Sequence, residues 1–327
     1  MKAPDSSINV QKTFSLPVTN WTCRLVWTLW GVALVLMALG HTVTTYGAGM
    51  VIPDWPTTYG HLPFLLPPKE WFEHWDIFLA YSHRLVAIIS GLLSLVVAAA
   101  FWRTRQNLHK WLATAAVFLV CLQVALGGLR VLTGDLLLVT IHACTGPVYF
   151  GLVTVLAVIA GSHRKRPSLD EPSPVKTRKR ASVVSIFVAS LAYLQLVLIA
   201  QLRHVSPQLI PTAPLVIVWA QVIIWGILGA VILGICLFLP GSCRAALGRM
   251  GLWLISGLYM VNVLLGILAW IVNFNLPPRF AHGVLTVEYT VVQAGAAQAV
   301  LTTAFVLVTS LLFATSLVLV VSNWLRE

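Results

Sequence analysis

Two histidines of this chain combine the residue type and the spacing that a bound heme iron requires. His83 lies in Leu79-Ala-Tyr-Ser-His-Arg-Leu and His142 in Val139-Thr-Ile-His-Ala-Cys-Thr, each about seven residues inside the start of a long apolar segment. Imidazole is a common axial ligand of heme iron, and histidines inside membrane helices usually face the bundle interior and a partner. Two imidazoles at one membrane depth therefore predict a bis-histidine heme site, with His83 and His142 as iron ligands.

The same two histidines also have a structural interpretation, which is hydrogen bonding between helices. Zinc fits less well because it takes three or four ligands, and we identify no third histidine at that depth in the first half of the chain. Each iron-bound imidazole should donate its other N–H to an acceptor, which the sequence does not identify. The equal depth of the pair favours one site for heme iron.

Arginine side chains near these histidines are candidates for binding the carboxylates of a porphyrin. Arg84 follows His83 directly, and Arg130 lies near the outer end of the third apolar segment. A planar guanidinium suits a heme propionate, although Arg84 could instead extend toward the membrane interface. Arg203 and His204 follow the fifth segment at the same outer face. These outer-face cations would suit the anionic edge of a porphyrin and lipid phosphates equally well. Arg84 and Arg130 are the predicted cofactor-binding arginines, and no catalytic residue is assigned.

The elements that must position these residues are membrane-spanning helices. Of 327 residues, 58% are hydrophobic and 9% charged, the mean hydropathy is +0.88, and one span needs roughly 20 apolar residues. The first segment is retained as a span because the polar residues before it are unlike a signal peptide. We expect an all-α polytopic membrane protein with eight helices at about 22–44, 76–101, 111–132, 137–161, 183–202, 214–239, 252–273 and 297–323.

The distribution of positive charge predicts the orientation. Once the spans are drawn, sixteen of the 21 lysines and arginines fall on the side of the two termini and five on the other. Positive loops stay in the cytoplasm, so we expect a multi-pass protein of the cell (inner) membrane with both termini cytoplasmic. This bias, with anionic head groups, accounts for the net charge of +11. The lipid bilayer is therefore an expected partner and nucleic acid is not.

One long linker divides the spans into two sets of four. We expect a cytoplasmic tail at 1–21, a first four-helix repeat with the heme site at 22–162, a basic cytoplasmic linker at 163–181 and a second repeat at 182–327. Leu122-Gln-Val-Ala-Leu-Gly-Gly in the third span resembles Val261-Asn-Val-Leu-Leu-Gly-Ile in the seventh. Membrane repeats commonly hold sites at equivalent positions.

Alignment of the repeats leaves the second site degenerate. Gln221 stands opposite His83, and Phe305 stands opposite His142. Phenylalanine cannot bind iron, so only the first half has a complete pair of ligands. The five cysteines form no Cys-x-x-Cys and indicate neither a disulfide framework nor a zinc site.

Four motifs together closely resemble the heme A synthase family. They are Gly-x-Gly…Pro-Asp-Trp-Pro in the loop 47–60, His-Arg in the second span, Leu-Gln-x-x-Leu-Gly-Gly-Leu-Arg-Val-Leu-Thr-Gly in the third and Ile-His in the fourth. The likeness covers most of the chain and is strongest from Thr42 to Ala160. It implies oxidation of the heme O methyl group to the formyl group of heme A, in support of terminal oxidase assembly. The cofactor expected from it is heme b or heme O, in one site. The partners it implies are the heme substrate and a heme O synthase, electron donor or oxidase assembly protein.

The chain departs from this family at positions that matter for chemistry. The resemblance implies a second pair of ligating histidines, where this chain has Gln221 and Phe305, and a glutamate one turn before the histidine of the second span, where it has Ala80. Alanine cannot relay a proton or act on a cationic intermediate. A cysteine pair that many members carry is replaced by Ile52 and Thr58.

Three functional hypotheses remain from the sequence. The first is a heme A synthase that tolerates these changes, drawing on another acid such as Asp54, Asp76 or Glu288. The second is a non-catalytic relative that binds a single heme for electron transfer or heme handling. The third is a transporter-like membrane protein in which both histidines are structural. The missing acid and ligand pair favour the second on chemical grounds and the resemblance favours the first, so enzymatic activity is left open.

Overall fold

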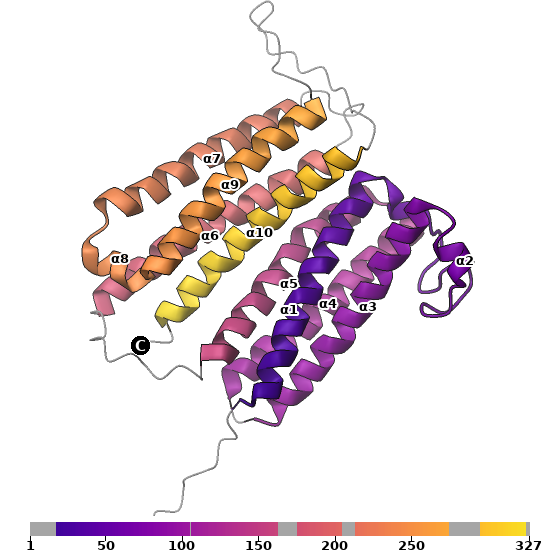
Figure 1. Ribbon diagram of the computed structural model, residues 1–327, viewed down its shortest axis with the longest axis horizontal. Helices are drawn as coiled ribbons and strands as arrows, with labels where there is room; N and C mark the ends of the chain where they lie inside the picture. Colours follow the sequence, from indigo (N-terminus) through magenta and orange to yellow (C-terminus); the bar gives the residue numbers. More distant parts are fainter. Residues whose placement is uncertain (1–17, 105, 163–174, 205–212, 275–294, 325–327) are drawn as a thin grey trace, which may run out of the picture.

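Long helices make up most of the structure. The computed structural model describes residues 18–104, 106–162, 175–204, 213–274 and 295–324, and eight helices in these ranges are long and apolar enough to cross a membrane (Figure 1). They are α1 Asn20–Thr45, α3 Trp75–Trp102, α4 Asn107–Thr133, α5 Leu136–Ser162, α6 Val175–His204, α7 Ala213–Phe238, α9 Arg249–Phe274 and α10 Ala296–Trp324. The short helices are η1 Ala48–Met50, α2 Pro68–Trp71 and α8 Gly241–Leu247. The prediction of an all-α protein with eight spans is confirmed.

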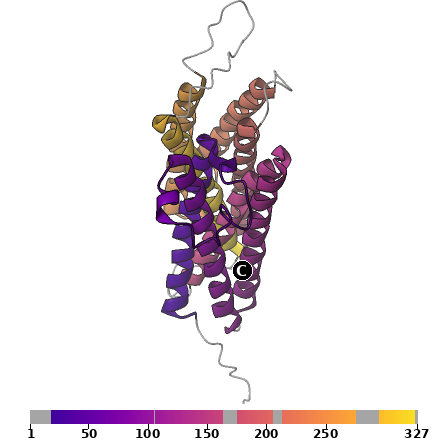
Figure 2. The ribbon, with the colours of Figure 1, turned by 90° about the vertical axis from the view of Figure 1, so that its right-hand side faces the viewer.

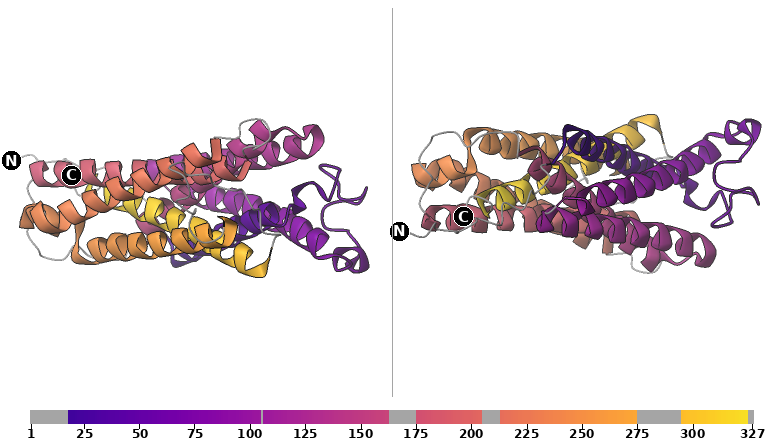
Figure 3. Two further views of the ribbon diagram at one scale, coloured as in Figure 1. Left: turned by 90° about the horizontal axis from the view of Figure 1, so that it is seen from above. Right: turned by 90° about the horizontal axis from the view of Figure 1, so that it is seen from below.

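The eight long helices form two adjacent groups of four. In the first group α1 contacts α3, α3 contacts α4, α4 contacts α5, and α5 closes the ring against α1. The helices α6, α7, α9 and α10 follow the same order of contacts. The groups meet where α10 contacts α1 and α5 and where α5 contacts α6, as the views in Figures 2 and 3 also show. The shared order agrees with an internal repeat, which stays a prediction.

The helices carry the surface that a bilayer requires. Large apolar side chains such as Phe118, Trp253 and Val300 are exposed, while backbone polar groups are bonded within each helix, as lipid demands. The first residues of α1 and the last residues of α10 lie at the same end of the bundle (Figure 1). We call the opposite end, where the loop between α1 and α3 projects, the outer end; its placement relative to a membrane stays a prediction.

One boundary differs from the expected domain plan. The basic linker was expected to run over 163–181, but α6 begins at Val175. Lysine and arginine are good helix formers, and their long side chains can reach the membrane interface from a helix. The basic residues from 176 to 180 therefore form the first turns of α6 and are not part of a linker before it. Residues 163–174 lie outside the described residues.

Candidate functional site

A cavity of about 270 Å³ lies toward the outer end of the first helix group and is not fully enclosed. Helices α1, α3, α4, α5, α6 and α10 and the loop between α1 and α3 supply its walls. The four predicted site residues His83, Arg84, Arg130 and His142 all line it. Folding therefore brings together residues that are up to 59 positions apart in the chain.

Helices α3 and α5 are in register at the two histidines. Ser90 follows His83 by seven residues and Tyr149 follows His142 by seven, and the Ser90 and Tyr149 hydroxyl oxygens are 2.8 Å apart. Seven residues are about two helical turns, and both helices run from the outer end inward. The two imidazoles therefore enter the cavity at matching levels.

The orientation of His142 is set by a backbone acceptor. Its Nδ1 is 3.1 Å from the carbonyl oxygen of Gln123 on α4. A carbonyl oxygen only accepts, so Nδ1 carries the proton and Nε2 keeps its lone pair for a metal ion. The side chain of Gln123 in turn donates to Thr145, and Gly127 leaves room for the ring because a Cβ there would be 3.4 Å from its Cε1. Gln123 thus provides the acceptor for His142 that the sequence does not identify.

His83 is buried in a different way. Its Nδ1 has no hydrogen-bond partner among the described residues, although the ring lies near the Leu36 carbonyl of α1. Gly40 of the same helix packs on the ring, since a Cβ at that position would be 3.0 Å from Cε1. An unpaired buried polar group costs about 1–3 kcal/mol. A buried imidazole held by packing at a cavity wall fits the chemistry of an axial heme ligand.

The two predicted arginines have different environments. The Arg84 Nη1 donates to the Asp54 carbonyl at 2.9 Å, the Thr57 carbonyl at 3.0 Å and the Thr58 hydroxyl at 3.3 Å, and its Nη2 donates to the Ile52 carbonyl at 3.0 Å. These four bonds tie α3 to the loop over residues 52–58. The guanidinium of Arg84 is therefore largely used in holding this loop.

Arg130 keeps most of its donors available. Its hydrogen bonding to the described residues is a single long contact of 3.5 Å from Nη1 to the Gly49 carbonyl. The side chain is half-buried at the cavity wall. Of the two predicted arginines, Arg130 is the one that can still bind an anionic group.

The loop between α1 and α3 forms one wall of the cavity. The Asp54 carboxylate accepts hydrogen bonds from the Thr57 hydroxyl at 2.5 Å and the backbone N–H groups of Tyr59 at 2.8 Å and Gly60 at 2.9 Å. Burial opposes ionisation of Asp54, but these donors lower its pKa below the ordinary value of 3.8. The loop is thus held from inside by Asp54 and from α3 by Arg84.

Trp55 is the large side chain that this loop places at the cavity. It lines the cavity, and it lies so close to Gly128 of α4 that a Cβ there would overlap the indole. The absence of a side chain at position 128 is therefore what lets the indole reach this wall. The two glycines of the Leu-Gly-Gly motif have separate roles, since Gly127 faces His142 and Gly128 faces Trp55.

The cavity wall carries no carboxylate among its described residues. Ala80, one turn before His83, is buried and faces the cavity. Of the three substitute acids, Asp54 is engaged by the loop, and Asp76 accepts a hydrogen bond from the N–H of Ile77 at the start of α3. Glu288 lies outside the described residues. The acid expected from the family pattern is not replaced by another carboxylate on this wall.

His41 of α1 is a cavity residue that sequence reasoning missed. It lines the cavity, and its buried Nε2 has no hydrogen-bond partner in the part of the chain that the structure describes. It follows Gly40, which packs on His83, so the expectation that the first half has no third histidine near that depth is wrong. Among the described residues, no group of three or more histidine, cysteine or acidic side chains is arranged to hold a metal ion. The signal available in the sequence was a polar residue close after the apolar run 32–39 of the same helix.

The second helix group also contributes to this cavity. Arg203 and His204, at the outer end of α6, line it. The Arg203 Nη2 donates to the Thr45 hydroxyl of α1 at 2.7 Å. With Arg84 and Arg130, Arg203 makes the cavity strongly cationic. A ligand with carboxylate groups suits such a wall.

Aromatic side chains fill the corresponding interior of the second group. Trp225 overlaps the place where a Cβ on Gly266 would be, and the Phe305 ring is 3.2 Å from the same point. The centroids of these two rings are 5.8 Å apart, and the Trp225 Nε1 donates to the Asn262 Oδ1 at 2.9 Å. In the predicted alignment of the repeats Trp225 corresponds to Ala87, which lines the cavity of the first group. An indole thus stands where the first group has a methyl group.

The local contacts agree with that alignment. Gly127 packs against His142 in the first group, and Gly266 packs against Phe305 in the second. Gln221, the counterpart of His83, is buried, and its Nε2 forms no hydrogen bond within the described ranges. At the positions that correspond to His83, Ala87 and His142, the described part of the second group therefore has an amide, an indole and a phenyl ring.

The fold and the site together define a class of protein. It is a polytopic helical protein with eight candidate spans and two in-register histidines in a cationic cavity. Residues 23–217 match the family described as cytochrome oxidase assembly protein (COX15-CtaA), and the chain belongs to this family. A curated heme A synthase of Shouchella clausii (strain KSM-K16) is 30% identical over 183 residues, which are 55% of this chain and 58% of the relative. The chain thus spans a little over half the length of that relative. The family match includes His83 and His142 and ends before Gln221, Trp225 and Phe305.

Proposed function

We propose that this protein binds one heme between His83 and His142 and acts in heme A biosynthesis for cytochrome oxidase assembly. The carrying observation is the pair of in-register imidazoles in one cavity. The proton of His142 is placed on Nδ1 by the Gln123 carbonyl, and the buried Nδ1 of His83 has no hydrogen-bond partner among the described residues. Membership of the family and the likeness to a heme A synthase support the same role.

Each residue around the proposed site has a task. His83 and His142 would hold the heme iron, and a bound heme would supply redox chemistry. Arg130 binds a propionate through the donors that its long contact with Gly49 leaves available. Arg84 is a positioning residue, because its bonds to the loop keep Trp55 on the cavity wall, where the indole keeps water away from the ligand.

The size of the cavity requires that part of a bound porphyrin lie outside it. Its volume of about 270 Å³ is slightly below the range for ligand pockets, roughly 300–1,000 Å³. A porphyrin would therefore fill the cavity and extend through its open side. Arg130 and Arg203, which line the cavity, would be the residues available to its carboxylates.

A second candidate function is supported by Ala80. This function is binding of a single heme without conversion, for electron transfer or heme handling. Because the described cavity wall has no carboxylate, a proton relay at that position would need a group from elsewhere. The two candidates share the same ligands and differ only in whether the heme is changed.

Expression with a source of heme O in a host that lacks its own synthase separates the candidates. Extraction and identification of the hemes would show heme A for biosynthesis and bound, unconverted heme for the second candidate. Absence of heme from the purified protein would contradict both. If the wild type does not convert heme O, Ala80→Glu is the informative variant, since its carboxylate would enter the cavity one turn before His83.

A further inference from the structure

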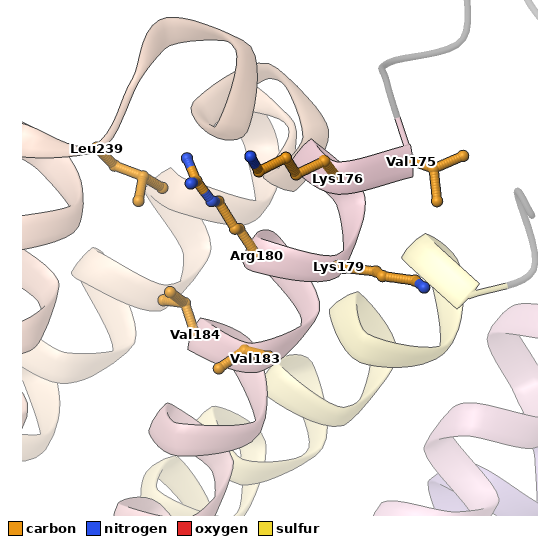
Figure 4. A pocket seen from close by; sticks show the side chains of 7 residues that line it. All are labelled: Val175, Lys176, Lys179, Arg180, Val183, Val184 and Leu239. Carbon is orange, nitrogen blue, oxygen red and sulfur yellow. The ribbon is translucent and has the colours of Figure 1, made fainter.

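A second pocket lies at the opposite end of α6 from the cavity. It has a volume of about 690 Å³ between the first turns of α6 and the end of α7 (Figure 4). Its polar wall consists of Lys176, Lys179 and Arg180, and its apolar wall includes Val183 and Leu239. The pocket shares no residue with the site around His83 and His142.

The basic side chains are arranged as a paired anion site. Lys176 and Arg180 are four residues apart, so they lie one above the other on the same helix face. Figure 4 shows both extending on the side of Leu239, whereas Lys179 extends toward α10. Both cations are exposed, and no acidic side chain in the described ranges forms an ion pair with either of them. Lys176 and Arg180 are therefore available to a phosphate group.

The apolar wall begins one turn further along the helix. Val183 is 65% exposed although it faces this pocket, and no charged residue occurs from 181 to 202. The change from cations to an uninterrupted apolar run marks the level where head groups meet acyl chains. The pocket thus combines the two chemistries of a phospholipid at the depth where a phospholipid lies.

We propose that this pocket binds an anionic phospholipid. The phosphate of the lipid contacts Lys176 and Arg180, and the acyl chains of the lipid lie along Val183 and Leu239. Lys179 adds to the positive field without facing the same side. Free phosphate would use the cations alone, whereas the exposed apolar wall beneath them favours a lipid.

Native mass spectrometry of the full chain with phosphatidylglycerol or phosphatidylcholine tests this proposal. The wild type should retain phosphatidylglycerol and release phosphatidylcholine. The double variant Lys176→Gln/Arg180→Gln should bind phosphatidylglycerol about 25-fold more weakly, at about 1 kcal/mol for each cation near an anionic head group. The matched control Arg24→Gln/Arg103→Gln removes the same charge from exposed positions in the first helix group. These positions lie at the end opposite the outer end, as the pocket does, and the control should bind phosphatidylglycerol as the wild type does.

Several outcomes would overturn the proposal. Equal loss in the pocket variant and the control would assign the affinity to overall positive charge. Retention of phosphatidylcholine would show that the charge of the head group does not determine binding. Displacement of the lipid by inorganic phosphate at equal concentration would show that the apolar wall does not contribute. Thermal unfolding without added lipid checks that both variants fold, with Lys176→Gln alone as the milder variant. The heme content of the pocket variant should equal that of the wild type.

Discussion

The backbone of Gly40 lies against the imidazole of His83, so that a Cβ at position 40 would be 3.0 Å from the ring Cε1. Gly40→Ala must therefore move the ring by a few tenths of an ångström. Overpacking of this kind costs about 1–3 kcal/mol, and we expect heme to bind roughly fivefold to a hundredfold more weakly. Titration of the purified apoprotein with heme, followed by Soret absorbance, measures the change.

Gly31→Ala is the matched control on the same helix. A Cβ at position 31 meets no atom within 4 Å, so heme should bind as in the wild type. The variant should be slightly more stable, because alanine favours a helix over glycine by up to about 1 kcal/mol. Equal weakening of heme binding by the two substitutions would show that packing on His83 is not the cause.

Arg84 and Arg130 should respond differently to the same substitution. Arg84→Gln removes the bonds to the carbonyls of the loop, and hydrogen bonds to charged groups are worth about 1.5–3 kcal/mol each. We expect a lower melting temperature and faster proteolysis of the loop even without heme. Arg130→Gln should leave both unchanged and weaken heme binding. Thermal unfolding of the apoprotein and heme titration of each variant give the two measurements, and identical profiles for the two variants would contradict the separate roles.

The carboxylate of Asp54 predicts acid sensitivity of the loop. Its pKa in the folded protein is lowered below 3.8 by donors from Thr57, Tyr59 and Gly60. A lowered folded pKa means that the contribution to stability is complete above the unfolded value and is lost as the pH falls through the folded pKa. Protease accessibility of the loop should therefore stay constant from neutral pH to about pH 5 and rise in stronger acid. Asp54→Asn should remove this pH dependence, and an unchanged acid transition in that variant would assign it to another group.

The interior of the second helix group should reject a heme even after its ligands are restored. Gln221→His/Phe305→His supplies two imidazoles but leaves the Trp225 indole in the space between α7 and α9. We expect the heme-to-chain ratio of this variant to equal that of the wild type. Addition of Trp225→Ala opens the space and should allow a second heme. Two hemes in the variant that retains Trp225 would show that the indole is not the obstacle.

The membrane fold was predictable because it depends on average properties of long segments. Hydropathy alone located all eight helices. The equal distance of His83 and His142 from the start of their spans predicted that the two imidazoles lie at one level. The start of α6 at Val175 was not predictable in this way, since lysine and arginine are typical both of polar linkers and of helix ends at a membrane surface.

The details of the site were less accessible to sequence reasoning. The acceptor for His142 is a backbone carbonyl of Gln123, and every residue has a carbonyl, so no residue type marks it. Arg84 is adjacent to His83, but its guanidinium is directed to a loop about 30 residues earlier in the chain. His41 was missed because its place at the cavity depends on how α1 packs against α3.

The heme ligation itself is tested most directly by the low-spin spectrum and the heme-to-chain ratio of the purified protein. We expect one six-coordinate heme per chain, with a bis-imidazole signature that is lost in His83→Ala and in His142→Ala. His41→Ala, which removes a third imidazole from the same cavity, should retain the signature. A spectrum unchanged in both ligand variants, or two bis-imidazole hemes in the wild type, would contradict ligation of one heme by His83 and His142.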